Sequence, residues 1–128
     1  MREKNLNKLV ATVIGTLLIA GGVAHADGDA AAGKRLFIRC GICHSVKSGE
    51  NKVGPSLFGV VGRPSASEPG YTYSSPVQGL KITWTPENID RWITDPHAMA
   101  PGTKMIFPGL KKATDRADVI AYLATLKN

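Results

Sequence analysis

The spacing of apolar positions along the chain predicts three helices joined by long loops. The first helix is expected over residues 30–39, where apolar side chains recur three and four residues apart after Asp29, a possible N-cap. Gly33 lies inside this stretch, although a glycine costs a helix interior about 1 kcal/mol relative to alanine. Gly33 therefore either allows another helix to approach closely or is a tolerated exposed residue.

Two further helices are expected nearer the C-terminus. Over residues 86–95 the apolar side chains form a stripe, Thr85 can cap the first turn, and Pro96 ends the helix. Over residues 115–126 five apolar side chains share one face behind the possible cap Thr114. No segment alternates polar and apolar residues long enough to build a sheet, so the sequence predicts an all-α fold.

The segment 45–83 is rich in glycine and proline, and at most a short helical turn is expected in it, near residues 57–61. A second loop covers residues 97–112. Loops of this length are unusual inside a compact domain, and they make sense if the chain wraps a rigid object. The apolar and aromatic residues that would face this object are Leu57, Phe58, Val60, Val61, Tyr71 and Tyr73.

The first 26 residues (1–26) have the pattern of a cleaved secretory signal peptide. Basic residues are followed by an apolar run over residues 9–24, and Ala24-His25-Ala26 resembles a cleavage site. An uncleaved membrane anchor is the alternative, but the apolar run is shorter than the roughly 18 residues expected of a spanning helix.

The remaining domain, residues 27–128, keeps 13 basic and 9 acidic residues of the 16 and 10 in the whole chain, a net charge of +4. Such a mildly basic surface is not the footprint of a nucleic-acid-binding protein. A domain of this size has a modest core, so a large buried cofactor would add to its stability. Exported proteins often carry disulfides, but the only two cysteines of this chain lie in one short motif.

The motif Cys40-Gly41-Ile42-Cys43-His44 has the spacing of a c-type haem attachment site. Two thiols at this spacing can each form a thioether with one vinyl group of a porphyrin, and the histidine that follows can ligate the iron. A dithiol redox pair and half of a zinc site are the alternatives. A zinc site needs four ligands, and the chain has no further cysteine to supply them. A thioredoxin-type pair needs a βαβ context.

A haem in an electron carrier usually has a second axial ligand from the protein. The candidates are Met99, Met105 and His97, and a thioether raises the reduction potential relative to a second imidazole. A Pro-Gly turn precedes Met105 and could direct its side chain to the iron, so Met105 ranks first, Met99 second and His97 third. The alternative role of Met105 is that of a core residue beside Ile106.

Together these features resemble the class I cytochromes c, small soluble electron carriers of bacterial periplasms and mitochondria. The resemblance covers essentially all of residues 27–128. It implies the cytochrome c fold, with three main helices and long loops wrapped around one covalently attached haem c. The motifs that carry it are, in chain order, Gly33 and Phe37, Cys40 to His44, Gly54-Pro55, Gly62-Arg63, Pro69-Gly70-Tyr71-x-Tyr73, Ile82-Thr83-Trp84, Pro101-Gly102-Thr103-Lys104-Met105 and Asp118-Val119-Ile120-Ala121-Tyr122-Leu123.

The resemblance also implies roles for individual residues. Met105 is implied as the sixth iron ligand, and the Pro55 carbonyl as the acceptor for the free N–H of His44. The residues implied to pack the first helix against the last are Gly33, Phe37 and Tyr122. The residues implied to hold a haem propionate are Arg63, Tyr73 and Trp84. Their donor groups suit a buried carboxylate, with aromatic core and a solvated loop charge as the alternative roles.

The chain departs from the family at two positions near the iron. Trp92 stands where many members have a tyrosine whose hydroxyl bonds the methionine sulfur, and Val77 stands where mitochondrial members have an asparagine. Both changes reduce polar control near the iron, since an indole N–H does not replace the tyrosine hydroxyl as a partner of the sulfur and valine has no polar group. Basic residues remain at family positions around the exposed haem edge, namely Arg39, Lys52, Lys104, Lys111 and Lys112.

We therefore expect a soluble, monomeric, periplasmic one-electron carrier with no enzymatic activity, no nucleic-acid partner and no membrane anchor. The basic residues would steer acidic redox partners (a dehydrogenase, a cytochrome complex or an oxidase) into transient contact, and solubility alone is their alternative role. The alternative function is that of a haem enzyme or sensor with a displaceable sixth ligand, either peroxidase-like or a dedicated cytochrome subunit of a periplasmic dehydrogenase. A peroxidase needs an open sixth site and a distal acid–base group. Met105 argues against the first, and His97 is the only candidate histidine for the second.

Overall fold

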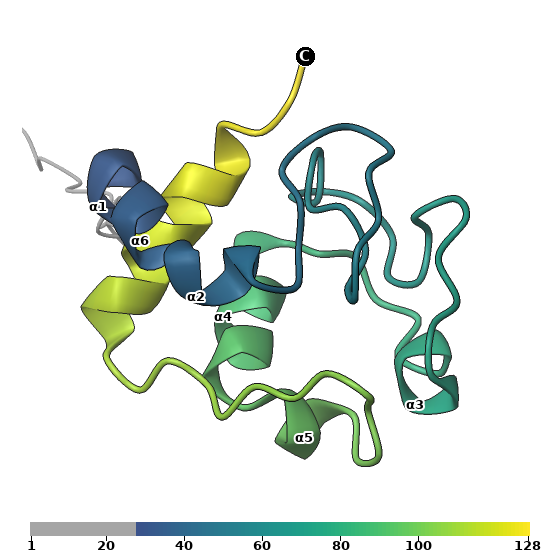
Figure 1. Cartoon of the computed structure of the whole chain (residues 1–128). Helices are drawn as coiled ribbons and strands as arrows, with labels where there is room; N and C mark the ends of the chain where they lie inside the picture. The colour runs from purple at the N-terminus through teal and green to yellow at the C-terminus, as the bar shows by residue number, and fades with distance from the viewer. Residues whose placement is uncertain (1–27) are drawn as a thin grey trace, which may run out of the picture.

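The computed structural model describes residues 28–128, so the expected signal segment, residues 1–26, lies outside the described residues. Within the described range the chain forms helices, loops and one isolated bridge between Pro64 and Thr83, and no strand. The fold class is therefore all-α, as the sequence predicts. The helices are α1 (Ala30–Leu36), α2 (Ile38–Gly41), α3 (Ser75–Gln78), α4 (Pro86–Thr94), α5 (Pro96–Met99) and α6 (Ala113–Ala124) (Figure 1).

The first predicted helix is present as two consecutive pieces. Asp29 caps α1 as expected, because its carboxylate accepts hydrogen bonds from the backbone N–H groups of Ala31 and Ala32 at 2.8 and 3.2 Å. Phe37 keeps right-handed helical dihedral angles between α1 and α2, so the second piece follows the first directly. α2 ends at Gly41, two residues beyond the predicted boundary, and it therefore carries the first cysteine of the motif.

The second predicted helix agrees with α4. The Thr85 hydroxyl accepts a hydrogen bond from the Asn88 backbone N–H at 3.2 Å, and the helix ends before Pro96. Pro96 also begins α5, whose cap Asp95 accepts a hydrogen bond from the Ala98 N–H at 3.2 Å. The prediction of a plain loop from residue 97 is wrong here, because a proline that ends one helix also suits the first turn of the next.

The third predicted helix begins earlier than expected. α6 starts at Ala113, so the prediction that Thr114 caps it is wrong, and no side chain caps it at Lys112. Arg116 holds the start of the helix instead. It donates hydrogen bonds to the two backbone carbonyls just before the helix, each at 3.0 Å, and pairs with Asp90 of α4 at 2.7 Å.

Helices α1 and α6 cross at close range and make the most extensive contact between helices (Figure 1). A Cβ atom at Gly33 would lie 1.9 Å from the backbone oxygen of Asp118 and 2.9 Å from the Cβ of Tyr122. The Phe37 ring packs edge-on against the Tyr122 ring, with 5.3 Å between their centres. Both the close-approach role of Gly33 and the packing of the first helix against the last are confirmed.

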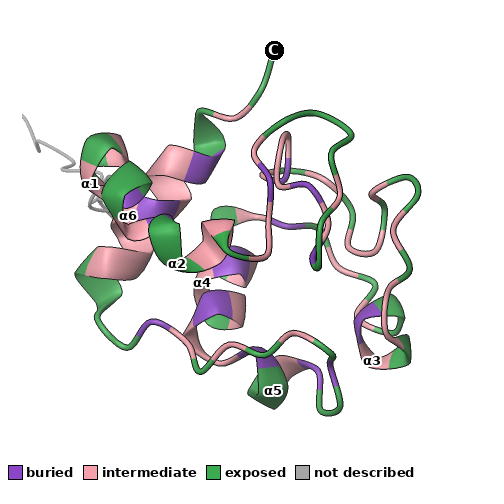
Figure 2. Ribbon diagram, in the orientation of Figure 1, coloured by how far each residue is buried: buried purple, intermediate pink, exposed green. Residues whose placement is uncertain are grey.

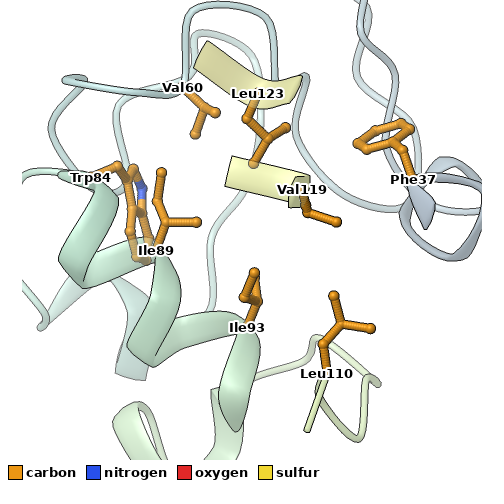
Figure 3. Packing of buried hydrophobic residues seen from close by; sticks show 8 residues of the cluster. All are labelled: Phe37, Val60, Trp84, Ile89, Ile93, Leu110, Val119 and Leu123. Carbon is orange, nitrogen blue, oxygen red and sulfur yellow. The ribbon is translucent and has the colours of Figure 1, made fainter. Parts of the chain in front are cut away.

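Most of the buried apolar residues lie on α4, on α6 and in the loops, where the ribbon is coloured as buried (Figure 2). Ile89 and Ile93 of α4 point toward Val119 and Leu123 of α6 (Figure 3). The residues of this hydrophobic core are Phe37, Val60, Trp84, Ile89, Ile93, Leu110, Val119 and Leu123. The core therefore covers the side of the domain that the helices form, and the loops of residues 45–83 lie on the other side (Figure 1).

Two stretches of backbone hydrogen bonding hold these loops in place without forming strands. Residues 43–47 run beside residues 54–57 through bonds of 2.8 and 2.9 Å. Residues 62–65 run beside residues 82–84 through bonds of 2.7 to 2.9 Å. Near residues 57–61, where at most a helical turn is expected, the chain makes a turn closed by the hydrogen bond from the Val60 N–H to the Leu57 carbonyl at 3.1 Å, and no helix; the short helix of the loop is α3.

Replacing Gly33 with alanine should lower the free energy of unfolding by about 3 kcal/mol, because the new methyl group meets backbone atoms that cannot move away. The matched control is Gly79→Ala, where the nearest atom would lie 3.5 Å away, and its effect should stay within about 0.5 kcal/mol. Urea denaturation of both variants measures this. Equal stability of the two variants would contradict the close approach of α1 and α6.

Candidate functional site

One cavity of about 320 Å³ lies between the helices and the long loops. Cofactor sites typically enclose roughly 300–1,000 Å³, so this cavity is large enough for part of a buried prosthetic group. Every residue that the sequence predicts to bind the cofactor lines this cavity, namely Cys40, Cys43, His44, Pro55, Arg63, Tyr73, Trp84 and Met105. The fold thus gathers predicted site residues from both halves of the domain around one space.

His44 is held in place by the loop that follows it. Its Nδ1 lies 2.7 Å from the backbone oxygen of Pro55, so a proton on Nδ1 is donated to this carbonyl and Nε2 keeps its lone pair. Burial lowers the pKa of His44, an effect that the hydrogen bond to Pro55 partly opposes, and the neutral imidazole that binds metals is favoured. Gly54 makes room for the ring, since a Cβ atom there would lie 2.4 Å from its Cε1.

Cys40 and Cys43 line the cavity at, and just after, the end of α2. Neither thiol is in a disulfide, and burial raises the pKa of the Cys40 thiol. Among residues 28–128 no group of three or more His, Cys, Asp or Glu side chains could hold a metal ion, so the zinc interpretation has no support there. The helices and loops of the described range also lack the βαβ unit of a thioredoxin-type pair.

Of the three candidate sixth ligands, only Met105 lines the cavity. Met99 lies in a separate groove beside α4 and α5, and His97 is exposed. The ranking of Met105 ahead of the other two therefore agrees with where the three side chains lie.

The loop that carries Met105 is tied to its neighbours at two points. The Met105 backbone N–H donates to the Thr103 hydroxyl at 3.3 Å, and the Thr103 side chain is buried. The Lys104 ammonium donates to the backbone oxygen of Thr72 and lies 4.5 Å from the ring centre of Tyr71. These contacts within the protein restrain the position of Met105 without any contribution from a cofactor.

One end of the cavity holds buried donors that find no partner among the described residues. Arg63 donates from Nη1 to the Phe58 carbonyl at 3.2 Å and from Nη2 to the Ser56 carbonyl at 2.9 Å, but its buried Nε has no partner there. Ser74 also lines the cavity, and its hydroxyl is likewise buried without a hydrogen-bond partner among the described residues. Unpaired buried donors are costly, so both atoms indicate an accepting group, such as a carboxylate, inside the cavity.

Aromatic residues complete this polar end. The Trp84 backbone N–H donates to the Arg63 carbonyl at 2.8 Å, which sets the two residues side by side. The Tyr73 hydroxyl accepts a hydrogen bond from the Glu68 N–H at 3.0 Å, and burial raises the pKa of Tyr73, so this hydroxyl keeps its own proton for donation. Sequence patterns do not identify Ser74 or Glu68 as site residues. The one available signal is that Glu68 is the only acid in an otherwise uncharged loop after Arg63.

The walls of the cavity are mostly apolar. Trp92 and Val77, the two departures from the family pattern, both line it, and Trp92 packs beside Trp84 with 5.4 Å between ring centres. The loop residues correctly predicted to face the central object are Leu57, Val60, Tyr71 and Tyr73. The same prediction is wrong for Phe58 and Val61, which do not line the cavity; Val61 packs on the outside of the hydrophobic core.

The donor set of this cavity fits haem c. It offers two thiols, a neutral imidazole and a thioether along apolar walls, as covalent attachment and iron ligation require. The charged side chains of the lining are Arg39, Arg63 and Lys104, all cationic, and the unpaired Arg63 and Ser74 donors suit the two propionates.

Comparison with known proteins agrees with this fit. The family model described as Cytochrome c matches residues 30–127. The chain is 43% identical over 122 residues to cytochrome c-554 of Methylosinus trichosporium, covering 94% of this chain and 92% of that protein. It is 52% identical over 101 residues to cytochrome c2 of Rhodopila globiformis, covering 78% of this chain and 95% of that protein.

Among solved structures, cytochrome cH from Methylobacterium extorquens matches with a TM-score of 0.72 and 41% identity, covering 77% of this chain and 99% of that one. The match in fold, the match in sequence and the fit of the cavity all have the same explanation. This chain belongs to the cytochrome c family, whose members bind covalently attached haem c.

Proposed function

We propose that this chain is a one-electron carrier that holds one haem c through thioethers at Cys40 and Cys43, with His44 and Met105 as the iron ligands. Members of the cytochrome c family carry electrons between redox proteins, which supports the general role. The single observation that carries the ligand assignment is that Met105 lines the same cavity as His44, whereas Met99 and His97 do not.

The protein's own residues would prepare this cavity for electron transfer. Bound haem supplies the one-electron couple. The Pro55 carbonyl orients His44 and increases its basicity as a ligand, and the contacts of Lys104 restrain the Met105 loop. Arg63, Tyr73, Trp84 and Ser74 are the residues that would hold the propionates. The apolar walls exclude water, and fixed ligands keep the structural change between the two redox states small.

The rival functions need groups that the cavity does not offer among its described lining. A peroxidase-like enzyme needs a distal acid–base group, but the lining contains no carboxylate and no histidine other than His44. A sensor needs a readily displaced sixth ligand, but the Met105 loop is restrained through Thr103 and Lys104. A dedicated dehydrogenase subunit would use the same haem site, and its partner would distinguish it from a free carrier.

A patch of exposed apolar side chains supports a docking face at the mouth of the cavity. Val53 and Ile106 line the cavity, yet they are 76% and 95% exposed. Ile42 immediately precedes Cys43 and Ile38 lies one turn earlier, and both are 75% exposed. We call Val53 and Ile106, the two that line the cavity, the apolar rim. Exposed apolar side chains at the opening of a cavity mark an interaction site, so the rim supports docking of a partner here.

The cations expected at the haem edge support the same role. Arg39 and Lys104 line the cavity, Lys52 donates to the Gly41 carbonyl at 2.7 Å, and Lys111 donates to the Thr94 carbonyl at 3.0 Å. With Lys112 they suit redox partners whose docking face carries carboxylates, in contacts that form and break quickly.

No helix within residues 28–128 is long and apolar enough to cross a membrane. We propose that the mature protein acts as a monomer in the periplasm after removal of residues 1–26.

Replacing Met105 with alanine should abolish the thioether–iron absorption band and lower the reduction potential, because the iron loses its thioether ligand. The matched control is Met99→Ala, which removes a methionine from the other groove and should leave both properties unchanged. Visible spectra and redox titrations of the two holoproteins measure this. An intact band in the Met105 variant, with loss of the band in the Met99 variant, would reverse the assignment.

Replacing Arg39 with glutamine should slow oxidation of the ferrous protein by ferricyanide about two- to fivefold at low ionic strength, because one cation at the cavity mouth is lost. Lys127→Gln removes the same charge beyond the end of α6 and should have a smaller effect. Stopped-flow rates at low and high salt measure both. Equal slowing by the two variants would show that only net charge matters, and would contradict a docking face at the mouth.

A further inference from the structure

Glu68 is a buried carboxylate that the proposed function leaves without a role. Its side chain is only 9% exposed, and one of its oxygens lies 2.8 Å from Nη1 of Arg63, whose side chain is 14% exposed. Glu68 itself does not line the cavity, whereas Arg63 does. A carboxylate this deeply buried is retained only when it is paired, so the two residues form one unit behind the polar end of the cavity.

The contacts of this pair determine which part of the arginine faces the cavity. The Glu68 carboxylate and two backbone carbonyls accept the hydrogen bonds that Nη1 and Nη2 of Arg63 donate. Nε remains the buried donor without a partner among the described residues. The backbone N–H of Glu68 also donates to the hydroxyl of Tyr73. Glu68 thus contacts two of the residues that would hold a propionate.

We propose that Glu68 is a positioning residue and counter-charge for Arg63, and that its negative charge lowers the reduction potential of the haem. This inference rests on the proposed function, because it needs haem in the cavity. Reduction adds one electron to the iron site, so a nearby cation favours the ferrous state and a nearby anion favours the ferric state. Glu68 offsets the Arg63 charge, and burial keeps water from screening this effect.

A second ion pair provides a matched control for this charge. Arg116 and Asp90 lie 2.7 Å apart, and Arg116 is 13% exposed, much like Arg63. Asp90 is 43% exposed, however, and neither residue of this pair lines the cavity. Removing the Asp90 charge therefore changes the net charge of the protein by the same amount, at a more solvated site outside the cavity lining.

The test is a redox titration of the holoprotein, with the variants E68Q, E68D and D90N. Glutamine keeps the volume and an accepting oxygen, so E68Q removes little besides the charge. E68Q should raise the reduction potential, and the shift should persist at high salt. D90N should give a shift several times smaller that fades with salt. E68D, which keeps the charge but shortens the side chain, should stay nearer to the wild type than E68Q does.

Two results would overturn the proposal: an E68Q shift no larger than that of D90N, or equal shifts in E68Q and E68D, which would indicate a packing effect. If E68Q does not assemble with haem, R63Q and the double variant R63Q/E68Q replace it. R63Q should lower the potential, and the added E68Q change should raise it again. An unchanged potential in the double variant relative to R63Q would also overturn the proposal.

The spectrum separates this proposal from the proposed function. E68Q should retain the thioether–iron band of the wild type, because no iron ligand is altered. An unshifted potential with an intact band contradicts the role of Glu68 alone. Absence of the band in the wild-type protein contradicts the ligand assignment instead.

Discussion

The rest of the structure depends on a core that is built around a cavity. Of the eight residues of the hydrophobic core, seven also line the cavity, and Leu110 is the exception. A cavity of about 320 Å³ left unfilled would cost about 8 kcal/mol at about 24 cal/mol per Å³. The total stability of a domain is about 5–15 kcal/mol. A group that fills this space would therefore add to the stability of the fold, beyond the backbone hydrogen bonds that hold the long loops.

The same constraint links the loops to function. Backbone hydrogen bonds between residues 43–47 and 54–57 bring the Pro55 carbonyl to His44, and those between residues 62–65 and 82–84 set Arg63 beside Trp84. One pairing thus positions the imidazole and the other positions the donors of the polar end. The haem side of the protein is organised by loop backbone, whereas α1 and α6 close the opposite side through the contact at Gly33.

Local chemistry explains which features the sequence predicts. The Cys40 to His44 motif, the Thr85 cap and the all-α class depend on residues close together in the chain, and they agree with the structure. The start of α6 depends on Arg116, whose partner Asp90 lies 26 positions away, so a local cap rule fails there. Loop geometry, which leaves no periodic signal in the sequence, decides three further features. They are the pairing of Glu68 with Arg63, the lack of a partner for the Ser74 hydroxyl among the described residues, and the position of Phe58 outside the cavity lining.

The central claim is that haem completes the core, and haem-free protein tests it most directly. The double variant C40S/C43S cannot form the thioethers, and it can be purified without haem and followed by far-ultraviolet circular dichroism during urea denaturation. We expect a weak helical signal and no cooperative unfolding transition, because seven of the eight core residues then border an unfilled space. A strong helical signal with a cooperative transition would show that the side chains alone support the fold, and would contradict this account.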